Sequence, residues 1–174
     1  MPSNPKKSTT HPGKVVLREV HPNDLPVLFA FESVPAWCTM AMVKPRSAEK
    51  FDAVWKKIFE DWANGLTNVF QKTIVVDNEA CGTIGCRLLG DRHEIGYGLG
   101  QAFWGRGIAS RALGLLLDQV PMRPLYATAA ATNAASIRVL EKHGFVIESR
   151  RTSPETERNL PCEEVVMVLN KRQS

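Results

Sequence analysis

Hydrophobic residues change their spacing along the chain, and this spacing predicts which segments are helices and which are strands. Between Ser47 and Gly65, apolar side chains recur every three or four positions, which predicts an amphipathic helix with Ser47 as its N-cap. A short strand over 14–20 and a short helix over 25–29 are predicted before it. Residues 37–42 show no regular spacing, so we expect a loop there.

From residue 67 onward the apolar positions begin to alternate, as they do in half-buried strands. Three strands are predicted in a meander, separated by turn residues at positions 77–78 and 90–91. An apolar stripe from Ala109 to Val120, closed by Pro121, then predicts a helix. The strands predicted over the whole of this region lie at about 67–76, 80–89, 92–100, 125–131, 145–152 and 163–170, the last one covered on both faces.

Composition narrows the class of protein. With 44% hydrophobic and 23% charged residues, the chain is predicted to form one domain over 14–174, after a disordered tail over 1–13. No apolar stretch approaches the roughly 20 residues that span a bilayer, and no apolar run follows the first lysines, so we expect a cytoplasmic protein without a membrane partner.

Charge and cysteine content exclude further classes of function. The formal net charge of +4 is dispersed along the chain, whereas nucleic-acid binding needs a clustered basic face, so no nucleic-acid partner is expected. The four cysteines contain no CxxC pair, and this argues against a metal site or a disulfide framework.

A glycine-rich turn, Trp104-Gly105-Arg106-Gly107-Ile108-Ala109, lies between a predicted strand and a predicted helix. Such a turn leaves backbone N–H groups free at the helix N-terminus, where they can hold an anion. A P-loop is excluded because Arg106 and Gly107 stand where its lysine and Ser/Thr are needed. A dinucleotide fold is disfavoured because no acidic residue follows at the required distance. We therefore predict a different phosphate-binding turn.

A second motif begins at Asn133, a favoured N-cap, and ends at Gly144, a natural end for a helix before the strand that starts at Phe145. The two motifs together resemble the GCN5-related N-acetyltransferases (GNAT), in particular the RimJ/RimL-like branch. In that branch the turn often reads W-G-x-G-x-A and the later helix reads N-x-x-S-x-x-x-L-x-x-x-G-F. The resemblance covers roughly residues 14–171.

The resemblance implies a mixed α/β (α+β) fold with a mostly antiparallel, twisted central sheet of about six or seven strands and about four helices. It also implies that acetyl-CoA is the co-substrate and that an acceptor amine attacks its thioester directly in a ternary complex. The residues implied in cofactor binding are Leu99, Gln101, Arg106, Gly107, Ile108, Ala109, Asn133 and Ser136.

In this family the strand before the turn splays away from its neighbour, so its backbone can bind the pantetheine arm. Gly96, Gly98 and Gly100 leave one face of that strand without side chains, which suits a cofactor lying against the backbone. Close packing of a helix against this face is the alternative.

The resemblance implies two catalytic candidates. Glu94 lies near the place where related enzymes carry a glutamate that removes the amine proton directly or through water, and we rank His93, on the opposite face, below it. Many members place a tyrosine seven residues after the capping asparagine, but this chain has Leu140 there. Ser136 is therefore the candidate that hydrogen-bonds the departing sulfur.

The acceptor stays open between a protein N-terminal α-amine and a small-molecule amine, with the protein acting as a monomer or homodimer. Residues 37–42 are the candidate acceptor wall, while Trp55 and Trp62 are assigned to the core. A cationic acceptor would favour an acidic mouth, to which Glu32 could contribute along with Glu19 and Glu49.

Two other functions remain possible from the sequence. The first is a CoA-binding regulatory or scaffold protein without turnover, which would explain the absence of the usual tyrosine. The second is a nucleotide-binding module unrelated to CoA.

Overall fold

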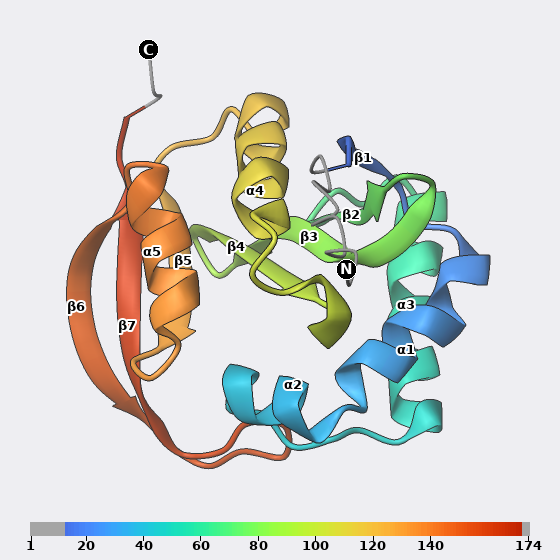
Figure 1. Ribbon diagram of the computed structural model, residues 1–174, viewed down its shortest axis with the longest axis horizontal. Helices are drawn as coiled ribbons and strands as arrows, with labels where there is room; N and C mark the ends of the chain where they lie inside the picture. The colour runs from blue at the N-terminus through green and yellow to red at the C-terminus, as the bar shows by residue number, and fades with distance from the viewer. Residues whose placement is uncertain (1–12, 172–174) are drawn as a thin grey trace, which may run out of the picture.

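The computed structural model describes residues 13–171, which form one seven-stranded sheet with helices on both faces (Figure 1). The predicted tail over 1–13 lies outside the described residues except for Gly13, as do the last three residues of the predicted domain. The elements are β1 (Val15–Glu19), η1 (Pro22–Asp24), α1 (Leu25–Glu32), α2 (Pro35–Ala41), α3 (Ala48–Ala63), β2 (Val69–Val76), β3 (Glu79–Leu89), β4 (Arg92–Leu99), η2 (Gln101–Phe103), α4 (Ile108–Gln119), β5 (Leu125–Ala130), α5 (Ala134–Lys142), β6 (Val146–Ser153) and β7 (Cys162–Leu169).

The predicted strands and the caps of α3 and α5 are confirmed, and the main error lies in the N-terminal region. Residues 37–42 were expected to be a loop, but most of them belong to α2, which begins at Pro35. Proline is well suited to a first helical turn. Seven residues are too few to show a helical period, and α1 is apolar on most sides, so neither helix leaves a clear stripe in the sequence.

The sheet has the order β1-β2-β3-β4-β5-β7-β6, and β4 and β5 are its parallel neighbours. They pair over only three residues each, His93–Ile95 with Leu125–Ala127. Beyond this point β4 continues to Leu99 on the side of β3, while β5 continues on the side of β7. The two strands therefore diverge, and an opening forms between them, as the family resemblance implies.

Glycines on β4 and just after it show how closely the N-terminal helices approach the sheet. A Cβ atom on Gly100 would lie 2.5 Å from the Phe31 ring, and one on Gly98 would lie 3.1 Å from the Trp37 ring. A Cβ atom on Gly96 would meet nothing within 4 Å. The expected bare face is thus used in two ways: helices pack against Gly98 and Gly100, and open space lies over Gly96.

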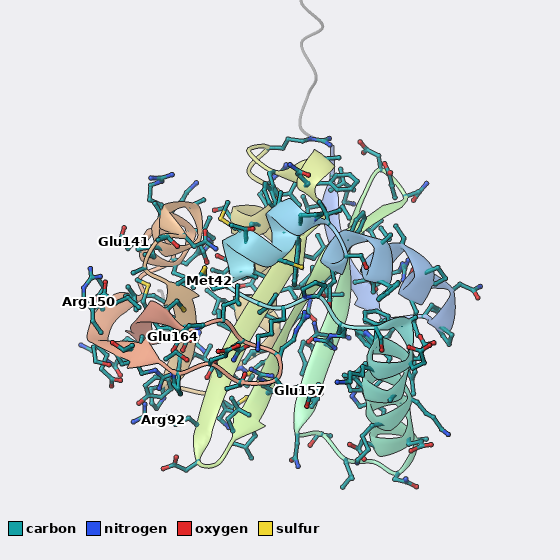
Figure 2. The ribbon with its side chains drawn as sticks, turned by 90° about the horizontal axis from the view of Figure 1, so that it is seen from below. Met42, Arg92, Glu141, Arg150, Glu157 and Glu164 are labelled. Atoms are coloured by element: carbon teal, nitrogen blue, oxygen red, sulfur yellow. The ribbon has the colours of Figure 1, made fainter. Side chains whose placement is uncertain are left out.

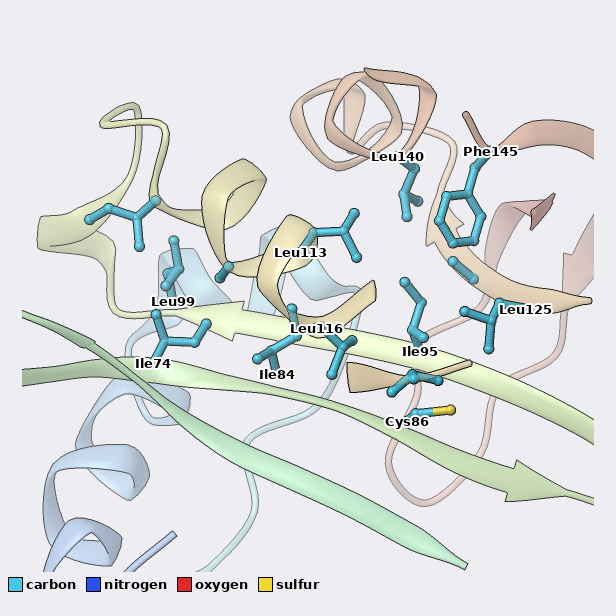
Figure 3. Close-up of a cluster of buried hydrophobic side chains, with 14 of the residues drawn as sticks. Ile74, Ile84, Cys86, Ile95, Leu99, Leu113, Leu116, Leu125, Leu140 and Phe145 are labelled. Atoms are coloured by element: carbon cyan, nitrogen blue, oxygen red, sulfur yellow. The ribbon is translucent and has the colours of Figure 1, made fainter. Parts of the chain in front are cut away.

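The main hydrophobic core lies between the sheet and helices α4 and α5 (Figure 3). Leu113 and Leu116 of α4 are fully buried above Ile84 of β3 and Ile95 of β4. Their burial fixes α4 over the middle of the sheet and so fixes the glycine-rich turn from which α4 begins. Within residues 13–171, no helix combines the length and the apolar character needed to cross a membrane.

A second core cluster joins the other face of the sheet to α1 and α3 through Val20, Leu28, Phe51 and Trp55. Asp24 lies beside it as a buried carboxylate. The Arg18 guanidinium contacts both of its oxygens, at 2.6 and 2.8 Å. The backbone N–H of His21 and the Thr73 hydroxyl, each at 2.9 Å, complete its hydrogen bonds. This network ties the start of the helical region to β1 and β2.

We predict that the free energy of unfolding of Asp24→Asn falls less than that of wild type when the pH is lowered from 4 to 2. The hydrogen bond from Arg18 lowers the pKa of Asp24 from 3.8 to about 2, with the bonds from His21 and Thr73 acting in the same direction. The charged form is thus favoured in the folded protein, and its contribution of about 2 kcal/mol is present above pH 4 and is lost as the pH falls toward 2.

Denaturant unfolding between pH 2 and pH 7 measures this contribution, with the exposed Asp52→Asn as a matched control. The stability gap between wild type and Asp24→Asn should close toward the acid end. A gap that is the same at every pH would show that the network does not stabilise the charged carboxylate.

Candidate functional site

Two cavities lie side by side along the second half of β4, beyond its pairing with β5. The larger, of about 300 Å³, is lined by the end of β4, the turn before α4, the start of α5 and part of α2. The smaller, of about 190 Å³, lies between α1–α3 and strands β2–β4. Trp37, Tyr97 and Gly98 line both cavities. A molecule in one cavity would therefore meet a molecule in the other at these three residues.

The glycine-rich turn forms one wall of the larger cavity. Gly105 and Gly107 have φ angles of +70° and +71°, a left-handed conformation that glycine adopts without strain. Gly107 is the N-cap of α4, and as a glycine it offers no side chain to accept a hydrogen bond from the N–H groups of the first turn. Because those N–H groups and the helix dipole favour negative charge, the turn can hold the diphosphate of a cofactor.

Arg111 holds the shape of this turn. Its guanidinium donates to the carbonyl oxygens of Arg106 at 3.2 Å and Gly107 at 3.3 Å, and to that of Gly13 at 2.7 Å. Because Arg111 binds these carbonyl oxygens, they do not repel an anion at the turn. The backbone N–H groups remain available to bind it. The Trp104 indole donates to the Leu99 carbonyl at 2.9 Å and so anchors the turn to β4.

The start of α5 forms the facing wall. Asn133 accepts a hydrogen bond from the Ser136 backbone N–H at 3.1 Å, which confirms the predicted cap, and its amide lies 3.5 Å from the Met40 carbonyl on α2. The Ser136 hydroxyl lies 2.9 Å from the Tyr97 hydroxyl of β4. This pair spans the opening between the diverging strands. Burial raises the pKa of Tyr97, more than the bond to Ser136 lowers it, so its phenol stays protonated near neutral pH.

Leu140 occupies the position where many family members carry tyrosine, and it faces the core. It is 1% exposed and packs beside Phe145, as Figure 3 shows. Leu140 therefore offers no hydroxyl to the larger cavity and does not line it. Tyr97 instead brings a phenol to the same opening, from β4 rather than from α5.

The structure brings together most of the residues that the sequence assigned to the cofactor. Those that line the larger cavity are Leu99, Gly107, Ile108, Ala109, Asn133 and Ser136. Gln101 is exposed on η2, and Arg106 is exposed with its guanidinium 5.6 Å from the centre of the Phe103 ring, so neither side chain belongs to the lining.

Glu94 does not line either cavity. It lies where β4 still pairs with β5, opposite Tyr126. It shares a strand face with Gly96, two residues further along, and Gly96 lines the smaller cavity. Glu94 therefore lies on the strand beside the smaller cavity and not in its lining.

Sequence reasoning missed Tyr97 and Arg111 as parts of the site, whereas Trp37, which was placed in the candidate acceptor wall, lines both cavities. Tyr97 had a signal, since it lies between Gly96 and Gly98, yet nothing local shows that its hydroxyl meets α5. Trp55, which was assigned to the core alone, is buried there and also lines the smaller cavity.

Comparison with known proteins agrees with this geometry. Residues 14–146 match the family model for the acetyltransferase (GNAT) domain. The chain is 26% identical over 145 residues to an uncharacterized N-acetyltransferase p20 of Bacillus licheniformis, covering 79% of this chain and 82% of that one.

Solved structures share the fold at low sequence identity. Spermidine N-acetyltransferase of Vibrio cholerae, in complex with CoA and spermine, matches with a TM-score of 0.75 and 14% identity over 90% of this chain and 95% of that one. RimL, a ribosomal L7/L12 α-N-protein acetyltransferase, matches with a TM-score of 0.75 and 20% identity over 90% of each chain.

We predict that Arg111→Gln weakens coenzyme A binding about tenfold, because the carbonyl oxygens of the turn lose their donor and the anion loses a nearby positive charge. Calorimetric titration measures the affinity. Arg138→Gln, an exposed residue on α5, removes the same charge elsewhere and should leave affinity unchanged. Pantetheine, which lacks the diphosphate, should bind wild type and Arg111→Gln alike. An equal loss for both ligands would contradict the role given to Arg111.

Proposed function

The chain belongs to the GNAT acetyltransferase family and is an acetyl-CoA-dependent N-acetyltransferase, and we propose how its own residues perform the transfer. Acetyl-CoA occupies the larger cavity and a primary amine enters the smaller one. The observation that carries this proposal is the set of three residues, Trp37, Tyr97 and Gly98, that line both cavities. With the thioester at this junction, the amine nitrogen attacks it directly, in one ternary complex and without an acyl-enzyme.

The turn from Arg106 to Ala109 binds the diphosphate through its backbone N–H groups. The side chain of Arg106 is exposed and is not needed for this binding. The pantetheine arm then runs along the unpaired edge of β4 toward the junction, past Leu99 on one side and Asn133 on the other. Backbone N–H groups on this edge, left free by the divergence of β5, polarise the acetyl carbonyl and stabilise the oxyanion that forms on it.

Ser136 and Tyr97 act on the leaving group. As the tetrahedral intermediate collapses, the carbon–sulfur bond breaks and the electron pair goes to sulfur. The Ser136 hydroxyl donates to the developing thiolate, and the protonated Tyr97 phenol, 2.9 Å away, donates to Ser136. The pair supplies from two elements what a tyrosine on the later helix supplies in many relatives.

Glu94 is the proposed base. Its position below the open space over Gly96 suits removal of the amine proton through a water molecule rather than by direct contact.

The finer parts of the proposal concern the partners of the enzyme. The acceptor is a protein N-terminal α-amine or a small-molecule amine, and the two solved structures compared above act on one of each kind. The protein acts as a monomer or homodimer. A cytoplasmic location is part of the proposal and agrees with four free cysteines, which are usual in a reducing compartment.

Thiol release from acetyl-CoA tests the whole proposal. We expect release that depends on an added amine, drawn from a panel of peptides, amino acids, monoamines and polyamines. Tyr97→Phe and Ser136→Ala should each lower kcat about tenfold to a hundredfold with a smaller effect on coenzyme A affinity. The double variant should lose little more than either single one, because both act on the same proton. Cofactor binding without amine-dependent thiol release would favour a regulatory or scaffold protein instead.

The pH profile tests Glu94 separately. Glu94→Gln should flatten the alkaline rise of kcat/KM, because the amine then has to lose its proton without a base. His93→Gln, on the opposite face of the same strand, serves as the control. A Glu94→Gln profile that overlays the wild-type profile would remove Glu94 from the mechanism.

A further inference from the structure

The acceptor cavity has a polar rim whose charge can be counted from the structure. Glu32, at the end of α1, lines the cavity, and ion pairs connect it to the segment that joins α2 to α3 and to the loop between β6 and β7. Figure 2 shows the last of these, which carries Glu157, reaching from the β6–β7 hairpin toward α3. We define the rim cluster as Glu32 and the two arginines that pair with its carboxylate, Arg46 and Arg158.

Glu32 is the charged residue in the described lining of the smaller cavity, and its carboxylate is already paired twice. Arg158 donates to Oε2 at 3.1 Å, and the Arg46 guanidinium lies 3.4 Å from the same oxygen. All three side chains are about a quarter exposed, so these pairs are partly shielded from solvent. An acceptor does not meet a free carboxylate here.

The two arginines lie close enough to affect one another. Burial lowers the pKa of Arg158, and the charge of Arg46 lowers it further, while Glu32 acts in the opposite direction. Two contacts with the backbone of Lys44 hold Arg158 in this place. The Arg158 guanidinium donates to the Lys44 carbonyl, and the Lys44 N–H donates to the Arg158 carbonyl at 2.7 Å. The positive charges are therefore fixed at the rim.

The ion pairs near the rim cluster balance in charge. Lys44 pairs with Glu155, and Lys50 pairs with Glu157. The rim cluster thus holds two guanidinium groups against one carboxylate, an excess of one positive charge. The other carboxylates considered for an acidic mouth lie elsewhere: Glu19 pairs with Lys72 on β1 and β2, and Glu49 is exposed in the first turn of α3.

Inside the rim the cavity is small and largely apolar. Leu28, Phe31, Trp37 and Trp55 provide aromatic and aliphatic walls, and the strands contribute Gln71 and Thr83 as neutral polar groups. Aromatic faces accept an apolar body and tolerate one ammonium group beside it. A second ammonium would have to lie at the rim, where the fixed charge is positive.

We propose that the acceptor is a primary amine that carries one positive charge on a small apolar or aromatic body, and that polyamines and other multiply charged amines are excluded. This inference rests on the proposed function and adds the substrate class to it. The same chemistry is offered by a free monoamine and by a peptide α-amine next to an apolar first side chain.

The test compares acceptors that differ by one ammonium. We use three matched pairs. The first is hexylamine and diaminohexane, and the second is phenethylamine and its aminomethyl derivative. The third is a peptide with an apolar first residue and the same peptide with lysine in that place. We expect each singly charged member to have a kcat/KM at least about tenfold higher than its partner. Whether kcat/KM is higher for the singly charged small amines or for the peptide with an apolar first residue shows if the acceptor is a free monoamine or a peptide α-amine.

Arg46→Gln removes the excess charge while Arg158 still pairs with Glu32, and it should bring the ratio within each pair close to one. Arg158→Gln should do the same, and having two variants guards against misfolding of either. Glu32→Gln should widen the ratio. Arg151→Gln is the matched control, because Arg151 is an ion-paired surface arginine on β6 outside the rim cluster. A wild-type preference for diaminohexane or spermidine, or a ratio that Arg46→Gln leaves unchanged, would overturn the inference.

A binding measurement separates this inference from the proposed function. Trp37 and Trp55 line the cavity, so their fluorescence reports amine binding in the CoA-saturated protein without turnover. Tighter binding of the singly charged members without thiol release would support the acceptor class and overturn the proposed function. Thiol release together with tighter binding of the diamines would support the proposed function and overturn the acceptor class.

Discussion

The site depends on the short pairing between β4 and β5. Three residues of each strand pair in parallel, and then the strands follow different neighbours, β4 along β3 and β5 along β7. Unpaired backbone groups are costly when buried, so the edge exposed by this divergence requires a partner. A ligand that lies along the edge can supply that partner. The Tyr97 and Ser136 hydroxyls bridge the opening near its start and keep its walls at a fixed separation.

The glycine-rich turn is held in place by the main core rather than by its own contacts. α4 is anchored through Leu113 and Leu116, which are fully buried, and its first turn projects from that anchored segment toward the opening. Arg111, one turn into the helix, binds the carbonyl oxygens of the turn. Stability and cofactor binding thus share one element: the apolar face of α4 builds the core, and its N-terminus meets the anion.

The parts of the site that could be predicted from the sequence are those set by near neighbours. Gly107 has its left-handed conformation and Asn133 caps its helix because of residues within three positions of each. The contact of Tyr97 with Ser136 joins residues 39 positions apart and depends on how α5 is placed against β4, which no local pattern encodes. Helix α2 was missed for another reason, since its seven residues hold fewer than two full turns of periodic signal.

The two halves of the site come from different parts of the chain, and this separates cofactor binding from acceptor selection. The larger cavity is built mainly from the continuous stretch β4, α4 and α5, whose motifs the sequence reveals. The charge at the acceptor rim depends on Arg158 meeting Glu32 from 126 positions away, on a loop with no role in the cofactor wall. The total charge of +4 could not reveal that local excess, because it does not show which charges meet at Glu32 and which cancel in pairs beside it. A substitution in the β6–β7 loop can therefore change which amines enter without disturbing the turn that holds acetyl-CoA. The motifs that reveal the cofactor half of the site therefore say little about which acceptor amine the protein prefers.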